Sequence, residues 1–340
     1  MGTTRGLLLV NLGTPDAPTT GAVRRYLREF LSDPFVIDLP APVRWLLLHL
    51  VILPSRPSKS AQAYRKVWSE RGSPLLWNSF DLVSEVARML EGEFVVHLAM
   101  RYGKPTLEDA LAAMKDKGVT ELVLFPLYPQ FATSSTESTV QRVAELLRTS
   151  WPGLPVKTVP AFFDDPGFLQ AFADVGMPVL EKSRADHVLF SFHGLPVRHV
   201  TRLDASGAHC LARPDCCDQL SEVNRHCYRA QSYATARALA ARWGLSPERY
   251  TVGFQSRLTS RWIQPFSDVL LVELAKKGVR RLAVVAPSFV ADCLETLEEI
   301  GIRAKEVFQA AGGEDLVLVP SLNAHPTWVR AVAELARRQA

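Results

Sequence analysis

Short apolar runs alternate with amphipathic segments along most of the chain. The runs Gly6–Leu12, Glu121–Leu127 and His187–Phe192 are rich in β-forming residues and end at Gly, Pro or polar residues, which predicts buried parallel strands. Between such runs, segments 137–149 and 267–277 carry apolar residues at helical spacing. Strands that alternate with helices predict an α/β fold whose parallel sheets are covered by helices on both faces.

A short repeat indicates two similar halves. Lys117-Gly118-Val119 and Lys277-Gly278-Val279 are each followed by a strand, a strand end that contains proline, and a helix. We therefore predict two similar α/β halves, residues 1–160 and 161–325, with a closing helix over 326–338 that packs back on the first half.

The second half contains a long polar segment between its first strand and its next helix. The pattern predicts a loop over 197–220, a helix over 221–243, and a later helix over 294–309. A loop of this length inside a compact domain usually has a function.

Composition indicates an ordinary globular protein. The chain has 340 residues, of which 47% are hydrophobic and 22% charged, and a net charge of +4 is too small to indicate a nucleic-acid partner. The N-terminus has no long apolar core and no small-residue cleavage site, so we expect no signal peptide and a cytoplasmic protein. The sequence does not indicate an oligomeric state.

The longest apolar run, residues 45–53, is too short to cross a membrane, because a spanning helix needs about 20 residues. Two interpretations remain open for it. It is either an ordinary buried helix or an apolar lip that holds a hydrophobic ligand and makes peripheral contact with the inner face of a membrane.

The cysteines suggest a metal site. Cys210, Cys216, Cys217 and Cys227 are close in sequence, and Cys293 is separate. Without an export signal, a metal site is favoured over a disulfide framework. Their spacing does not match the paired C-x-x-C pattern of zinc knuckles. Four thiolates can hold a [2Fe-2S] cluster. The alternatives are a zinc site built from four thiolates, a zinc site that also uses His209 or His226, and free thiols.

Polar side chains follow several predicted strands, and His193 is the most informative of them. It ends a buried strand and is followed by the strand-breaking residues Gly194 and Pro196, and ligands of open α/β sheets bind outside such strand ends. Histidine is also suited to proton transfer near neutral pH. Glu295 and Glu299 share one face of a predicted helix, either as an acidic first turn or as a carboxylate array that faces His193.

At these residues the chain resembles the ferrochelatases, the terminal enzymes of heme biosynthesis. The matching stretches, in order, are NLGTPDAP (11–18), FLSDPFVIDLP (30–40), AMRYGKP (99–105), PLYPQFATSSTEST (126–139), SFHGLP (191–196), CYRAQSYATAR (227–237), VGFQSRL (252–258) and APSFVADCLETLEEI (286–300). The resemblance implies two Rossmann-like domains with a porphyrin cleft between them. It also implies insertion of Fe2+ into protoporphyrin IX with release of two protons.

The resemblance also implies roles for individual residues. His193 resembles the family's essential histidine, and Glu295 the essential glutamate of its ETL motif; both would also meet the substrate Fe2+. We expect substrate contacts from six residues: Leu12, Arg101, Tyr102, Tyr128, Trp262 and Glu299. The chain departs from some relatives at Cys293, where they have histidine.

Some bacterial ferrochelatases resemble this chain in carrying four cysteines just after the HGLP loop, and those proteins hold a [2Fe-2S] cluster. The resemblance therefore implies that Cys210, Cys216, Cys217 and Cys227 are the ligands and that Cys293 is not.

Two alternatives to a protoporphyrin ferrochelatase stay open for the function: a porphyrin carrier without turnover, and a chelatase for coproporphyrin or another metal. The segment 11–15 resembles the protoporphyrin branch of the family.

Overall fold

The computed structural model describes residues 3–340, which form two units. Unit 1 comprises the described residues up to Tyr128, Thr133–Pro160 and Trp328–Ala340. Unit 2 comprises Pro129–Ala132 and Ala161–Thr327.

Unit 1 is built on a parallel four-stranded sheet. Its strands are β1 (Arg5–Gly13), β2 (Phe94–Tyr102), β3 (Glu121–Pro126) and β4 (Val156–Thr158), in the order β2-β1-β3-β4. The central strand β1 is apolar from Gly6 to Val10 and buried throughout that stretch, because helices cover both of its faces.

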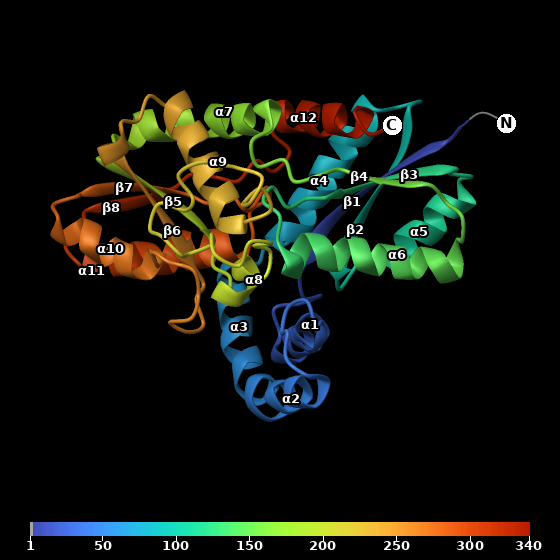
Figure 1. Cartoon of the computed structure of the whole chain (residues 1–340), viewed down its shortest axis with the longest axis horizontal. Coiled ribbons are helices and arrows are strands. Elements are labelled where there is room, and N and C mark those ends of the chain that lie inside the picture. Colours follow the sequence, from blue (N-terminus) through green and yellow to red (C-terminus); the bar gives the residue numbers. More distant parts are fainter. Residues whose placement is uncertain (1–2) are drawn as a thin grey trace. The chain divides into compact units, whose positions relative to one another are not determined.

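Several helices surround this sheet. The helices of unit 1 are α1 (Thr20–Ser32), α2 (Ala41–Leu46), the π-helix η1 (Leu47–Ile52), α3 (Leu53–Val67), α4 (Pro74–Met89), α5 (Leu107–Asp116), the π-helix η2 (Thr133–Glu137), α6 (Ser138–Ser150) and most of α12 (Pro326–Arg337). Helices α1, α4, α5 and α6 contact the strands, whereas α2, η1 and α3 pack with one another and with α1. Leu8 and Leu124 of the sheet pack with Met114 of α5 and Val143 of α6, and Figure 1 shows these two helices together below the strands. Helix α4 contacts β1 and β2.

Unit 2 repeats this plan with other strands. They are β5 (His187–His193), β6 (Tyr250–Gln255), β7 (Arg281–Val285) and β8 (Asp315–Leu318), all parallel, in the order β6-β5-β7-β8. In each sheet the first strand lies between the second and the third. The prediction of an α/β fold with two Rossmann-like parallel sheets is confirmed.

The helices of unit 2 are α7 (Pro166–Ser183), α8 (Val197–Thr201), α9 (Tyr228–Arg242), the 3-10 helix η3 (Pro247–Arg249), α10 (Ser267–Lys276), the π-helix η4 (Glu295–Ala304) and α11 (Lys305–Ala310). One face of the sheet packs against α10, η4 and α11 through a core that includes Leu189, Leu274, Ile300 and Phe308. Figure 1 shows α10 and α11 on one side of these strands and α7 and α9 on the other.

Two helix predictions need correction. The helix expected over 221–243 begins only at Tyr228. The Asn224 side chain accepts a hydrogen bond from the Ser221 N–H (2.7 Å) and donates to the carbonyls of Cys216 (3.0 Å) and Gln219 (2.9 Å), so it holds these residues in turns. The helix expected over 294–309 is a π-helix as far as Ala304 and an α-helix only from Lys305.

The strand order determines where a ligand site can form. In each sheet the chain moves from its first strand to one side and then crosses to the other side, so the sheet has a switch point between β1 and β3 and between β5 and β7. Crevices at such switch points, outside the carboxyl ends of the strands, are the usual ligand sites of open α/β sheets. His193 is the last residue of β5 and stands at this position in unit 2.

Candidate active site

The backbone around His193 is held from two sides. The Gly194 N–H donates to the Gln255 carbonyl at the end of β6 (2.8 Å), and the His193 N–H donates to the Ser288 hydroxyl after β7 (3.2 Å). A Cβ atom on Gly194 would lie 2.7 Å from the Gln255 carbonyl oxygen and 3.2 Å from the Trp262 ring, so only glycine allows this close approach.

The His193 ring has a defined tautomer. Its Nδ1 lies 2.7 Å from the Gly194 carbonyl oxygen, which can only accept, so Nδ1 carries the hydrogen and Nε2 has a free lone pair in the neutral ring. Burial lowers the pKa of His193, while Glu295 and the bond to Gly194 raise it by less. The net lowering keeps the imidazole neutral near neutral pH, so Nε2 can accept a proton.

The carboxylates of η4 lie on the same unit. Glu295 is the first residue of η4, and the Thr296 hydroxyl accepts from the Cys293 N–H (2.9 Å) and donates to Asp292 (3.1 Å), which fixes the start of the helix. Glu299 accepts a hydrogen bond from Ser256, and burial together with the charge of Glu295 raises its pKa to about 7. The structure thus brings Glu295 and Glu299 together.

Trp262 and Cys293 complete the surroundings of His193 and Glu295. The ring centroids of Trp262 and Phe289 lie 6.5 and 6.2 Å from that of His193. Burial raises the pKa of the Cys293 thiol well above its ordinary value, and the adjacent Glu295 carboxyl raises it further. The cysteine that stands in for the histidine of some relatives is therefore a neutral thiol and supplies no second base.

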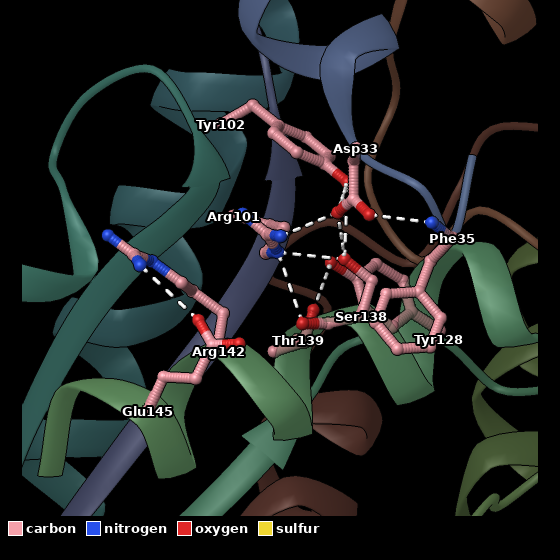
Figure 2. A network of polar contacts seen from close by, with 9 residues as sticks. All are labelled: Asp33, Phe35, Arg101, Tyr102, Tyr128, Ser138, Thr139, Arg142 and Glu145. Atoms are coloured by element: carbon pink, nitrogen blue, oxygen red, sulfur yellow. Dashed lines mark hydrogen bonds and ion pairs between the residues drawn. The ribbon is translucent and has the colours of Figure 1, made fainter. Parts of the chain in front are cut away.

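A buried polar network occupies the corresponding region of unit 1 (Figure 2). The Asp33 Oδ2 atom accepts from Arg101 Nη2 (2.5 Å), the Tyr102 hydroxyl (2.7 Å) and the Ser138 hydroxyl (2.6 Å), and Oδ1 accepts from the Phe35 N–H (2.7 Å). Arg101 Nε also donates to the Ser138 hydroxyl (2.8 Å). The network joins the end of α1, the end of β2 and the start of α6.

This network changes the interpretation of two predicted substrate contacts. Tyr102 is 1% exposed and its hydroxyl donates to Asp33, so in this structure its side chain is part of the protein interior. Tyr128 is also buried, with its hydroxyl 3.4 Å from that of Thr139. Leu12, next to the last residue of β1, is partly exposed.

Asp33 itself was not singled out by the sequence pattern. One local signal was present: a carboxylate at the C-terminus of a helix opposes the helix dipole, so Asp33 after α1 requires another reason for its position. The Arg101 guanidinium, whose side chain is only 14% exposed, pairs with Asp33 and supplies that reason.

The four clustered cysteines lie together in unit 2, before and at the start of α9. Cys216, Cys217 and Cys227 are buried, and the Cys216 and Cys217 sulfurs are 3.7 Å apart. Cys227 is close enough to both Cys217 and Cys210 to shift the pKa of each thiol. Within residues 3–340, no three or more His, Cys, Asp or Glu side chains are arranged to surround one metal ion.

Arg229 lies against these sulfurs. Its Nη1 atom is 3.1 Å from the Cys217 sulfur and 3.9 Å from the Cys216 sulfur, so the guanidinium donates toward both. A cation at this position favours electron-rich sulfur, as in a metal-bound thiolate.

The apolar segment 45–53 is divided between two environments. Leu48 and Leu53 are buried and pack with Leu31 of α1. Trp45 and Leu50 are 56% and 65% exposed, and three further apolar side chains of α2 and η1 are also exposed: Val43, Leu46 and Val51. We call these five residues the apolar lip. In the described part of the chain, no helix has the length and apolar character needed to cross a membrane.

Comparison of the whole structure with solved structures identifies the fold class. The sirohydrochlorin chelatase SirB from Bacillus subtilis subspecies spizizenii, in complex with cobalt, matches with a TM-score of 0.56 at 10% identity and covers 99% of this chain and 96% of its own. SirB from Bacillus subtilis with Fe3+ matches with a TM-score of 0.53 at 14% identity and the same coverage. The fold is that of the chelatases.

Sequence comparison identifies the family. The Ferrochelatase family model matches residues 4–340. A ferrochelatase from Azotobacter vinelandii is 50% identical to this chain over 98% of the chain and 99% of its own length. A ferrochelatase from Pseudomonas aeruginosa is 47% identical over 99% of both chains. A ferrochelatase from Coxiella burnetii is 47% identical over 98% of this chain and 93% of its own length.

The chain belongs to the ferrochelatase family. It is a lyase that inserts iron into a porphyrin for heme synthesis.

The buried network of unit 1 makes a stability prediction. Asp33→Ala should lower the free energy of unfolding by about 3–5 kcal/mol, because it leaves the Arg101 charge buried without its carboxylate. Asp81→Ala is the matched control: it also removes a carboxylate bonded to an arginine, Arg71, but both side chains are well exposed, so a much smaller loss is expected. Urea unfolding of the two variants measures the difference, and equal losses would contradict the structural role of Asp33.

Proposed function

We propose that this chain inserts Fe2+ into protoporphyrin IX to give protoheme, with His193 as the proton acceptor and Glu295 as the partner carboxylate. The observation that carries this proposal is the free Nε2 of a neutral His193 beside Glu295. A free-base porphyrin must lose two pyrrole protons as the metal enters, so the site needs a base with a lone pair.

Each group has a chemical task in this proposal. His193 Nε2 takes the two pyrrole protons one after the other, and each leaves through the carboxylates of η4 before the next is taken. The Gly194 carbonyl and Glu295 stabilise the imidazolium formed in each step, since both raise the pKa of His193. Glu299, with its pKa near 7, can take up and release the proton at neutral pH. Glu295 with His193 can also meet the incoming Fe2+, a borderline cation that accepts carboxylate and imidazole ligands.

The aromatic and unit 1 residues complete the proposal. We assign macrocycle contacts to Trp262, whose ring lies near His193, and to Leu12. Arg101 is paired with Asp33, so we assign to Arg101, Tyr102 and Tyr128 the indirect role of holding the residues around the substrate in shape. Binding of a flat macrocycle in a distorted form would expose its nitrogens to the metal.

We also propose that the chain has two domains. The first comprises residues 1–160 together with helix 326–338, and the second comprises residues 161–325.

Protoporphyrin is favoured over the more polar coproporphyrin by the exposed apolar lip and by the segment 11–15. A carrier without turnover would require a pocket but neither the base nor the carboxylate. The orientation of Nε2 and the raised pKa of Glu299 therefore favour an enzyme.

Substitution of the two central groups tests the assignment. His193→Ala should abolish detectable iron insertion, and Glu295→Gln should lower kcat by about 100-fold or more while porphyrin still binds, because an amide keeps the shape but cannot take a proton. Anaerobic assays with Fe2+ and both porphyrins measure the rates, and fluorescence titration measures porphyrin binding.

Glu299→Gln is the matched control for this experiment, and it should reduce turnover less than Glu295→Gln. Wild-type turnover by His193→Ala at saturating substrates would refute the base assignment. A loss with Glu299→Gln but not with Glu295→Gln would reverse the roles of the two carboxylates.

For the four clustered cysteines we propose a [2Fe-2S] cluster held by Cys210, Cys216, Cys217 and Cys227. Such a cluster takes two thiolates on each iron, and the neighbouring sulfurs of Cys216 and Cys217, and the proximity of Cys227 to Cys210, support pairs of this kind. The Arg229 guanidinium suits an anionic thiolate centre. When bound, the cluster would cross-link segment 197–227 to the start of α9, and no step of the iron insertion is assigned to it.

The cluster proposal predicts coloured protein. Freshly purified protein should be reddish, be bleached by dithionite and contain about two irons per chain. Cys217→Ser should lose the colour and unfold at lower temperature, whereas Cys293→Ser should keep it, because Cys293 lies beside Glu295. Colourless protein with stoichiometric zinc after anaerobic, iron-replete expression would refute the cluster without affecting the chelatase assignment.

For the apolar lip we propose peripheral contact with the cytoplasmic face of a membrane. Its exposed side chains can enter the lipid boundary while Leu48 and Leu53 anchor the segment in unit 1. This location would give the enzyme access to a hydrophobic substrate dissolved in the bilayer.

Vesicle binding tests the lip. Trp45→Asn combined with Leu50→Asn should weaken co-sedimentation with phosphatidylcholine–phosphatidylglycerol vesicles by about tenfold or more, since each side chain would lose a favourable transfer into lipid. Phe80→Asn is the control, because Phe80 is 48% exposed in α4, outside the lip. Equal vesicle binding by the wild-type protein, the double variant and Phe80→Asn would contradict membrane contact through this segment.

A further inference from the structure

Gln255 forms hydrogen bonds to both elements that carry the proposed chemistry. It is the last residue of β6, it pairs with His193 in the parallel register, and it is 7% exposed. Its carbonyl accepts from the Gly194 N–H (2.8 Å), its Oε1 accepts from the Ser191 hydroxyl (2.8 Å), and its Nε2 donates to the Glu295 carbonyl (3.2 Å).

The orientation of this amide follows from its partners. The Glu295 carbonyl can only accept, so the NH2 group of Gln255 must face it, and Oε1 must then face Ser191. The Ser191 hydroxyl also lies 2.8 Å from that of Ser267. A flipped amide would place two acceptors together at Glu295, so the side chain has one favourable arrangement.

The next residue strengthens the connection to η4. Ser256 has a φ of 62°, a left-handed conformation that is unusual for a residue other than glycine. Its hydroxyl donates to Glu299, so consecutive residues reach two positions of η4, the Glu295 backbone and the Glu299 side chain. An unfavourable backbone conformation persists where the surrounding contacts determine it, and such positions cluster at functional sites.

We propose that Gln255 is a positioning residue that fixes the separation between His193 and Glu295. The inference rests on the proposed function, which assigns the chemistry to these two side chains. They come from different elements, β5 and η4, and Gln255 is hydrogen-bonded to the backbone of both. A reacting pair must be held within about 0.5 Å of its productive arrangement, and a displacement of about 1 Å can lower a rate by about 100-fold.

Gln255→Met tests the proposal, because methionine has a similar volume and removes both amide hydrogen bonds. The kcat for iron insertion should fall about 10- to 100-fold, while KM for porphyrin and for Fe2+ stays within about threefold. Gln255→Glu is a second variant that keeps an acceptor for Ser191 but cannot donate to Glu295, and it should show a comparable loss. Ser191→Ala is the control: it removes only the bond that does not lead to η4 and should stay within about threefold of wild type.

A double variant separates positioning from a general loss of structure. If Gln255 acts through Glu295, Gln255→Met combined with Glu295→Gln should be no slower than Glu295→Gln alone. A further tenfold loss in the double variant would overturn the proposal. A wild-type kcat in Gln255→Met, measured together with an impaired Glu295→Gln, would also overturn the positioning role of Gln255. That result would leave the proposed function intact. Full activity of Glu295→Gln would instead refute the proposed function and, with it, the positioning role.

Discussion

The parallel pairing of β5 with β6 is the constraint on which the geometry of the candidate site depends. It sets His193 level with Gln255 at the carboxyl edge of the sheet, where the Gly194 N–H meets the Gln255 carbonyl. The close approach requires glycine at 194, and the resulting turn presents the Gly194 carbonyl to His193 Nδ1. The register of two strands therefore decides which nitrogen of the His193 imidazole is free to accept a proton.

The two sheets share a strand order but use their switch points differently. In unit 1, three donors converge on one oxygen of Asp33, and Arg101 neutralises its charge. In unit 2, Glu295 and Glu299 are close enough for the charge of Glu295 to raise the pKa of Glu299, and Arg303, which pairs with Glu298, offsets this only in part. The charge of Asp33 in unit 1 is neutralised by a fixed partner, whereas in unit 2 burial and a neighbouring like charge raise the pKa of Glu299 to about 7.

The sequence predicted those features that depend on nearby residues. A buried apolar run that ends in His193-Gly194 marks both the strand β5 and the position of its carboxyl end. Asp33 could not be found in this way, because its partners Arg101, Tyr102 and Ser138 lie 68, 69 and 105 residues further along the chain. The late start of α9 depends on the side-chain hydrogen bonds of Asn224, which apolar spacing does not reveal, and the same spacing does not distinguish the π-helix η4 from an α-helix.

The raised pKa of Glu299 means that this carboxyl group of the candidate site reduces the stability of the fold. Glu299 changes from an ordinary value of 4.5 to about 7 in the folded state, so the folded chain binds this proton more tightly than the unfolded chain. The contribution of Glu299 to folding is therefore least favourable above pH 7 and improves as the pH falls toward 4.5, by about 3 kcal/mol in total. The Ser256 hydroxyl opposes the shift and so recovers part of this loss. The hydrogen bonds that hold the Gln255–Ser256 turn against η4 thus have a second effect: they hold in place a carboxyl group whose proton affinity suits transfer at neutral pH, although its position destabilises the folded chain.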